Sequence, residues 1–128
     1  FKKSQRSGRA DLSAQALARI APALQGIAAG FQDPLTIPEL ARRCGMSVRS
    51  FQQHFTRLIG HSPQQHLVKS RVQAATALLP DSESANADIA YRCGFNTLSS
   101  FNRAFRASHR ASPREYRKGS NAIGGRVD

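Results

Sequence analysis

Residues Asp88–Tyr116, DIAYRCGFNTLSSFNRAFRASHRASPREY, decide the fold of this chain. Their pattern predicts a short helix over Asp88–Cys93, a turn opened by Gly94 and a second helix over about Leu98–Ser108. Apolar residues at helical spacing clamp the two helices together, whereas hydrogen-bonding and cationic side chains lie on the outer face of the second helix. Two short helices joined by a tight glycine turn, the second polar and basic, are typical of a helix-turn-helix.

The same pattern occurs a second time in Glu39–Lys69, ELARRCGMSVRSFQQHFTRLIGHSPQQHLVK. The two copies share a Cys-Gly pair, two phenylalanines four residues apart and a Ser-Pro pair, with one extra residue in the turn of the later copy. The chain therefore contains two helix-turn-helix units. The matching positions are Cys44-Gly45 with Cys93-Gly94, Phe51 and Phe55 with Phe101 and Phe105, and Ser62-Pro63 with Ser112-Pro113.

At these residues the sequence resembles the DNA-binding domain of the AraC/XylS transcription regulators. The second unit of that family typically shows Ile-Ala, Gly-Phe, a Ser-x-Phe-x-Arg-x-Phe-Arg/Lys run, then Gly-x-Ser/Thr-Pro and Tyr-Arg. The resemblance covers roughly Ala14–Lys118. In one departure, Arg110 stands where the family usually has glycine. The motif is found here in Ile89-Ala90, Gly94-Phe95, Ser99, Phe101 to Arg106, Ser112-Pro113 and Tyr116-Arg117.

These patterns predict an all-α fold of about seven helices, in which a long linker helix bridges two helix-turn-helix units. We expect a basic linker or tail over residues 1–11, a DNA-binding domain over 12–118 and a frayed tail over 119–128. Within the domain, the first unit spans 12–62, the linker helix 63–79 and the second unit 84–118. A linker helix of roughly 25 Å can hold the recognition helices near the ~34 Å repeat of the duplex.

Helix signals elsewhere in the chain fit this outline. Thr36-Ile37-Pro38-Glu39 is a capping box with proline in the first turn, and Ser84 or Asn86 is expected to cap the helix after the linker. Pro22 either kinks the N-terminal helix or marks its start. The apolar stripe of that helix is predicted at Leu17, Ile20, Leu24, Ile27 and Phe31.

Composition favours a polyanionic partner. The chain has 128 residues, a formal net charge of +11 and a pI of about 11.3, and such an excess of basic residues attracts nucleic acid.

Both cysteines end an equivalent helix and are interpreted as small buried residues, since a metal or redox site needs more ligands at closer spacing. The sequence shows neither an apolar run near the ~20 residues of a membrane span nor a signal peptide, which favours the bacterial cytoplasm or nucleoid.

Polar positions on the two recognition helices are the candidate base contacts. Glutamine amides bond adenine in bidentate fashion, and arginine suits guanine N7 and O6. On an isolated helix these residues would form an ordinary solvated face, but the repeat and the turn favour contact with DNA. Leu98 is either a contact to a thymine methyl group or a plain exposed apolar residue. The predicted base contacts are Arg49, Gln52, Gln53, Leu98, Ser99, Ser100 and Arg103.

A second set of residues is predicted to contact the DNA backbone, which sets the register without reading the sequence. The resemblance implies double-stranded DNA at a promoter or operator as the partner, with RNA polymerase as a second partner. The chain begins with Phe rather than Met, so we expect a fragment without the N-terminal effector-binding and dimerisation domain of larger family members. The predicted backbone contacts are Arg43, Arg57, Arg92, Asn102, Arg106 and Arg114.

Two other function classes are disfavoured. The histidines His54 and His61 lack a thiol or carboxylate at the spacing of a metal site or catalytic triad, and the sequence has no glycine-rich phosphate loop, so an enzyme, a cofactor or a metal is not expected. A cationic membrane-surface protein would carry its basic residues along one long amphipathic helix, whereas here they are spread over short helices. The sequence does not specify the operator, the effector or whether transcription rises or falls.

The departure at Arg110 has two interpretations. In the first unit, Gly60 lies three residues before Pro63, where a left-handed residue commonly ends a helix. If Arg110 is left-handed, it carries a strain of roughly 1 kcal/mol, offset by attraction of its guanidinium to the helix C-terminus and to DNA phosphate. Alternatively, the helix ends in another way without strain.

Overall fold

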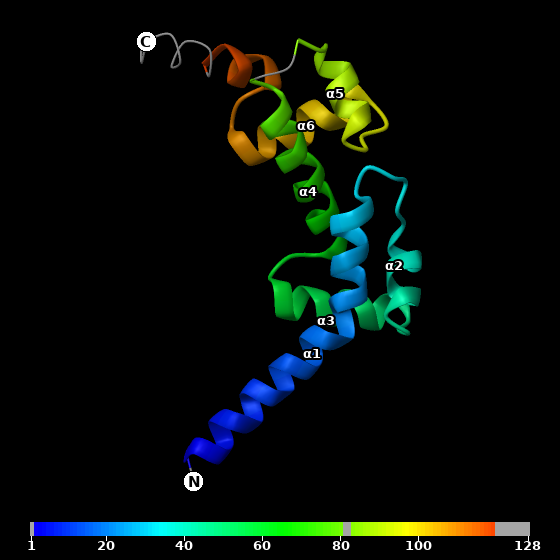
Figure 1. Ribbon diagram of the computed structural model, residues 1–128, viewed down its shortest axis with the longest axis vertical. Coiled ribbons are helices and arrows are strands. Elements are labelled where there is room, and N and C mark those ends of the chain that lie inside the picture. Colours follow the sequence, from blue (N-terminus) through cyan, green and yellow to red (C-terminus); the bar gives the residue numbers. More distant parts are fainter. Residues whose placement is uncertain (1, 81–82, 120–128) are drawn as a thin grey trace. The chain divides into compact units, whose positions relative to one another are not determined.

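The computed structural model describes the backbone of residues 2–80 and 83–119 and the side chains of residues 13–80 and 83–119. Within these ranges the secondary structure is entirely helical, which confirms the predicted fold class. A helical stretch over residues 113–119 follows the last labelled element. Of the tail predicted over 119–128, residue 119 belongs to this helical stretch, and 120–128 lie outside the described residues. The helices labelled in Figure 1 are α1 Lys2–Gly30, α2 Ile37–Arg43, α3 Val48–Ile59, α4 Pro63–Leu78, α5 Asn86–Arg92 and α6 Leu98–His109.

Contacts divide the chain into two compact subdomains. Subdomain one comprises Phe1–Gly30 and Leu35–His66, and subdomain two comprises Phe31–Pro34 and Leu67–Asp128. The chain therefore leaves subdomain one after α1, contributes a short connection to subdomain two, and returns for α2. Helix α4 begins in subdomain one and continues in subdomain two. Each subdomain thus contains one helix-turn-helix, α2–α3 or α5–α6.

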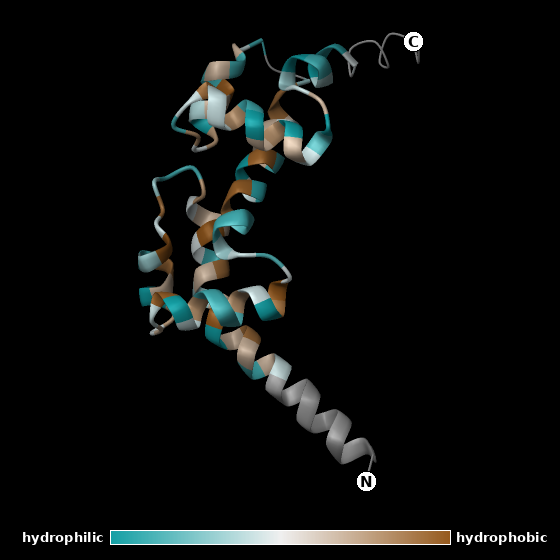
Figure 2. Ribbon diagram, turned by 180° about the vertical axis from the view of Figure 1, so that it is seen from behind, coloured by the Kyte–Doolittle hydropathy of each residue, from teal (hydrophilic) through white to brown (hydrophobic). Residues whose placement is uncertain are grey.

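In subdomain one, helices α1, α2 and α3 pack against one another. Figure 2 shows hydrophobic residues (brown) alternating with hydrophilic ones (teal) along the helices, as amphipathic elements require. Leu17, predicted to belong to the apolar stripe, is instead 46% exposed, because α1 is much longer than the helices that cover it. Pro22 lies inside α1 and does not mark its start. The buried apolar residues are Ile20, Ala23, Ile27, Leu40, Ala41, Phe51 and Phe55.

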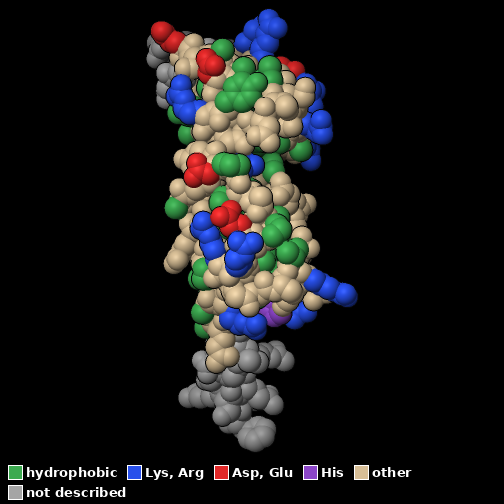
Figure 3. All heavy atoms as spheres, turned by 90° about the vertical axis from the view of Figure 1, so that its right-hand side faces the viewer, with side chains coloured by type: hydrophobic (Ala, Val, Ile, Leu, Met, Phe, Trp, Pro, Cys, Tyr) green, Lys and Arg blue, Asp and Glu red, His purple; other side chains and the backbone are tan. Residues whose placement is uncertain are grey.

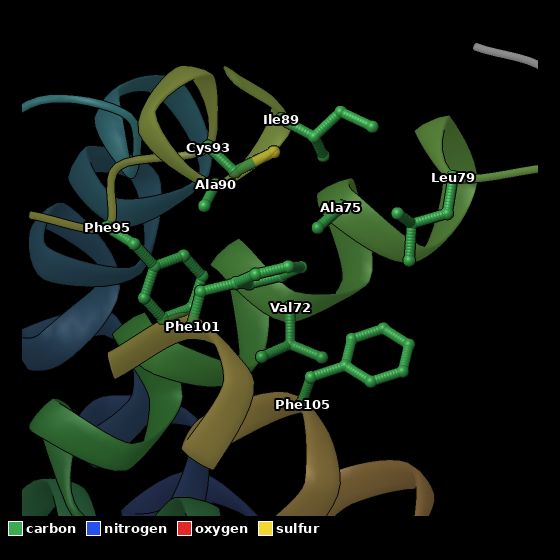
Figure 4. Packing of buried hydrophobic residues seen from close by; sticks show 9 residues of the cluster. All are labelled: Val72, Ala75, Leu79, Ile89, Ala90, Cys93, Phe95, Phe101 and Phe105. Carbon is green, nitrogen blue, oxygen red and sulfur yellow. The ribbon is translucent and has the colours of Figure 1, made fainter. Parts of the chain in front are cut away.

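In subdomain two, α5 and α6 pack together and α4 supplies one side of their core. Figure 4 shows the rings of Phe95 and Phe101 side by side, and they are tilted by 57° with their centroids 5.3 Å apart. Full burial of one such aromatic side chain stabilises a fold by roughly 1.5–3 kcal/mol. The core therefore fixes α6 by the face opposite its polar residues. The cluster consists of Val72, Ala75, Leu79, Ile89, Ala90, Cys93, Phe95, Phe101 and Phe105.

Arg71 attaches the connection between α1 and α2 to subdomain two. Its Nε donates a hydrogen bond to the carbonyl of Phe31 at 2.7 Å, and its Nη2 donates to the carbonyl of Asp33 at 3.0 Å. Burial lowers the pKa of the Arg71 guanidinium, but the group remains charged at neutral pH. A partly buried cation needs acceptors, and these two backbone carbonyls supply them. This explains why residues 31–34 belong to subdomain two.

Arg117 joins three segments of subdomain two. Its Nε donates to the carbonyl of Leu79 at 2.8 Å, its Nη1 to Oδ1 of Asn86 at 2.8 Å, and its Nη2 to the carbonyl of Ser84 at 2.9 Å. Neither Ser84 nor Asn86 caps α5, contrary to the expectation from the sequence. The N-cap is Ala85, without a side-chain hydrogen bond, because the Asn86 side chain accepts from Arg117 instead.

Candidate nucleic-acid interface

The two helix-turn-helix turns have the same backbone hydrogen bonds. After α2, the amide of Met46 donates to the carbonyl of Ala41 and that of Gly45 to Arg42, both at 3.0 Å. After α5, Phe95 donates to Ala90 at 3.0 Å and Gly94 to Tyr91 at 3.1 Å. This pair of bonds defines a Schellman motif, which requires a left-handed residue. Glycine occupies that position in both turns, with φ of 67° at Gly45 and 105° at Gly94.

Side-chain caps then set where each predicted recognition helix begins. Ser47 Oγ accepts a hydrogen bond from the amide of Ser50 at 3.2 Å at the start of α3. Thr97 Oγ1 accepts from the amide of Ser100 at 3.0 Å at the start of α6, and its own hydroxyl donates to Ser100 Oγ. Because these bonds satisfy amides of the first turn, both helices present a defined N-terminal turn to a ligand.

The exposed face of α3 forms a single polar surface. The predicted base contacts Arg49, Gln52 and Gln53 are all exposed and lie together there. With Thr56 and Arg57 they line an open hollow of about 650 Å³. On the opposite side of the helix, the Phe51 and Phe55 rings are buried edge to face, with centroids 5.7 Å apart. The buried rings therefore orient the polar face outward, and its amides and guanidiniums have the chemistry that binds base edges.

The candidates on α6 divide between two places. Ser99, Ser100 and Arg103 are exposed, and Ser100 also takes part in the cap bonds. Leu98, 37% exposed, lines a separate hollow of about 550 Å³ beside the start of α5. The structure therefore groups Leu98 with Arg114 rather than with Arg103. The other residues that line this hollow are Ala85, Asn86, Ala87, Arg117 and Lys118.

The residues predicted to contact the DNA backbone are all exposed. Figure 3 shows Lys and Arg side chains (blue) on both subdomains, at their edges and within the face in view. Lys118, which the sequence reasoning missed, joins Arg114 at the hollow beside Leu98. Its spacing of four residues after Arg114 could have indicated this, since such positions share one face of a helix. The exposed residues are Arg43, Arg57, Arg92, Asn102, Arg106 and Arg114.

The cysteines and histidines have roles within the fold. Burial raises the pKa of the Cys44 and Cys93 thiols, which disfavours reactive thiolates. His54 Nδ1 donates to the carbonyl of Ser50 at 2.8 Å, since a carbonyl can only accept. His109 Nε2 lies 2.9 Å from the hydroxyl of Thr76.

Among the described residues, no group of three or more potential ligands could hold a metal ion, and no helix could cross a membrane.

The two predicted recognition helices end in the same backbone conformation but with different residues. Gly60 ends α3 with φ 95°, and its amide donates to the carbonyl of Thr56 at 2.9 Å. Arg110 ends α6 with φ 55° and ψ 22°, and its amide donates to the carbonyl of Arg106 at 2.8 Å. Arg110 is the left-handed non-glycine residue of the described chain. The strained interpretation of the backbone is therefore correct, while contact of Arg110 with phosphate stays a prediction.

We expect Arg110→Gly to raise the melting temperature, because glycine adopts the left-handed conformation without a Cβ penalty of roughly 1 kcal/mol. For a domain of this size the rise would be roughly 4 °C in a thermal unfolding scan. The matched control is Gly60→Arg, which places the same strain at the end of α3, where a Cβ would meet no neighbour within 4 Å. It should lower the melting temperature by a similar amount. An Arg110→Gly variant no more stable than the parent would contradict the strain.

Comparison with known proteins agrees with this geometry. Residues 40–119 match a family model described as a helix-turn-helix domain. Over 93 residues the chain is 35% identical to the HTH-type transcriptional activator RhaS of Escherichia coli, a match that covers 73% of this chain and 34% of RhaS. The chain thus spans about a third of the length of that curated relative.

Two solved structures are similar over most of this chain. One is the DNA-binding domain of AdpA, described as the global transcriptional factor, in complex with a target DNA. It has a TM-score of 0.77 and 31% identity, covering 81% of this chain and 94% of that chain. The other is a probable AraC family transcriptional regulator from Rhodopseudomonas palustris, with a TM-score of 0.73 and 28% identity over 80% of this chain and 97% of that chain. These relatives are transcription regulators, not enzymes.

Proposed function

Because the chain belongs to the AraC-type family of helix-turn-helix domains and is a DNA-binding module of a transcription regulator, we propose that α3 and α6 are its two recognition helices. Each helix reads base edges in the major groove of double-stranded DNA. The main observation that supports this proposal is the exposed polar face of α3, where Arg49, Gln52 and Gln53 line one hollow. The buried phenylalanines behind that face hold it in a fixed orientation.

The two helices contribute different chemistry to the readout. On α3, two amides suit adenine and Arg49 suits guanine. On α6, Arg103 is the main base reader, with Ser99 and Ser100 beside it, and Leu98 is available for a thymine methyl group. The exposed arginines around these faces, together with the neutral Asn102, contact phosphates and set the register. The phosphate contacts of this proposal are Arg43, Arg57, Arg92, Asn102, Arg106 and Arg114.

Regulation of transcription extends the proposal to the whole protein. RhaS is a transcriptional activator by name, which supports activation through RNA polymerase as the role of this module. Its site of action is then a promoter or operator on the bacterial chromosome, in the cytoplasm. An effector-binding and dimerisation domain in the same protein would supply the signal that this module converts into DNA binding.

Replacement of the base readers tests the proposed function. Preferred sites are first selected from a library of random duplexes with the parent chain. Arg103→Ala and Gln52→Ala should each weaken binding to the selected site by ~1–3 kcal/mol and relax the preference at particular base pairs. The lost contacts discriminate between bases, so unrelated duplexes should lose less affinity than the selected site.

Arg57→Ala is the matched control for these variants. Arg57 is also exposed on α3, but it is proposed to contact phosphate, so its loss should weaken all duplexes alike. Fluorescence anisotropy on selected and scrambled duplexes measures both effects. Unchanged base preference in Arg103→Ala would show that α6 does not read bases through this residue.

A further inference from the structure

The helices that follow α3 and α6 both begin with a Ser-Pro pair, and their N-terminal caps differ in one hydrogen bond. At the start of α4, the amide of Gln65 donates to Ser62 Oγ at 3.1 Å, and the amide of Ser62 donates to Gln65 Oε1 at 2.9 Å. These two bonds form a closed capping box. After α6, the amide of Glu115 donates to Ser112 Oγ at 3.1 Å, which is the first bond of the same box.

The second bond is replaced by an ion pair. Among the described residues, the Glu115 carboxylate makes its contact with Arg106 of α6, with 4.0 Å between Oε1 and Nη2, rather than with the amide of Ser112. The side chains of Arg106 and Glu115 are 65% and 63% exposed. A glutamate at this position is as able as glutamine to close a capping box. Its different orientation therefore needs a cause outside the cap.

The cause lies on the recognition helix. Gln65 follows Thr56, and Glu115 follows Arg106, by the same interval of nine residues, so Thr56 and Arg106 occupy equivalent positions in the repeat. The first copy has a neutral pair, Thr56 and Gln65. The second copy has a cation and an anion, which attract each other across the turn. This charge difference between the two copies explains why the Glu115 carboxylate lies toward Arg106 rather than toward the amide of Ser112.

We propose that Glu115 is a positioning residue, which holds the Arg106 guanidinium on α6 and limits the attraction of subdomain two to DNA phosphates. This inference rests on the proposed role of α6 as a recognition helix and of Arg106 as a phosphate contact. A carboxylate within 4.0 Å of the guanidinium competes with phosphate for the same cation. The first copy has no such competition at Thr56. Glu115 therefore lowers affinity for any sequence and leaves base readout unchanged.

The test is Glu115→Gln, which removes the charge and provides the residue that closes the cap in the first copy. Exposed ion pairs of this kind are weak, so we expect DNA to bind about two- to fivefold more tightly at low salt. The gain should be equal for selected and scrambled duplexes, and the salt slope should steepen by about 0.9. Glu39→Gln, in α2, changes the net charge equally and should give a smaller gain. A Glu115→Gln variant that binds DNA no more tightly would overturn the proposal.

A double-mutant cycle with Arg106→Ala isolates the pair. Arg106→Ala alone should weaken binding to all duplexes, and in its background Glu115→Gln should tighten binding no more than Glu39→Gln does. If Glu115→Gln tightens binding equally with and without Arg106, the effect is general charge and the positioning role is wrong, while Arg106 remains a phosphate contact. If Arg106→Ala leaves affinity unchanged, the proposed phosphate contact fails and the inference fails with it.

Discussion

We expect the affinity of this chain for duplex DNA to fall about 10³–10⁴-fold between 50 and 200 mM monovalent salt. The reason is that each Arg or Lys that contacts a phosphate releases a condensed counterion. With Arg110 and Lys118 added to the arginines proposed to contact phosphate, the interface has about six to eight such contacts, which corresponds to a slope of roughly −5 to −7 in a plot of log affinity against log salt. A titration monitored by fluorescence anisotropy at several salt concentrations measures this slope.

Two variants test whether the proposed phosphate contacts cause this salt dependence. Arg57→Ala should reduce the slope by about 0.9, because it removes one phosphate contact. Substitution of a base reader such as Gln52, which is uncharged, should weaken binding without changing the slope. A parent slope shallower than about −2 would contradict a broad phosphate interface.

Alanine at Gly94 is expected to destabilise the fold by about 3 kcal/mol, far more than alanine at Gly45. Both residues have a left-handed backbone, so both substitutions cost roughly 1 kcal/mol of strain. At Gly94 a Cβ would also lie 2.6 Å from the carbonyl oxygen of Phe31 and 2.7 Å from Nε of Arg71. These two atoms are hydrogen-bonded to each other, so the new methyl group would separate them.

Gly45 provides the matched control, because no neighbour lies within 4 Å of a Cβ built there. Urea unfolding monitored by circular dichroism gives the free energy of unfolding for each variant. Gly45→Ala should lose only the strain of the backbone. Equal losses in the two variants would mean that the contact of the Gly94 turn with Phe31 and Arg71 contributes nothing to stability.

Local signals explain why so much of the fold was predictable from the sequence. The Thr36 cap and the glycine end of α3 depend on residues only a few positions apart, and both are found in the structure. The paired phenylalanines of each unit also identify the buried face, since their spacing places them on one side of a helix. The exposed face of α3 follows directly from that assignment.

Features that depend on distant residues could not be predicted in this way. The cap of α5 was wrongly predicted because the Asn86 side chain accepts from Arg117, a partner 31 positions away. The grouping of Leu98 with Arg114 and Lys118 likewise depends on how the N-terminus of α5 lies beside α6. The contact of Glu115 with Arg106 depends on how the chain turns after α6. Each of these requires tertiary structure, which a periodic pattern does not contain.

The hydrogen bonds of Arg71 have a consequence for how such proteins can recombine. The acceptor at Phe31 is separated from Arg71 by 40 positions, and α2 and α3 lie between them in the chain. A graft of residues 67–119 into a foreign scaffold would therefore carry a partly buried guanidinium without its acceptors. The second helix-turn-helix therefore depends on residues 31–34 for its complete set of hydrogen bonds. Functional chimaeras between relatives should inherit the tetrapeptide 31–34 and Arg71 from the same parent, as one linked set.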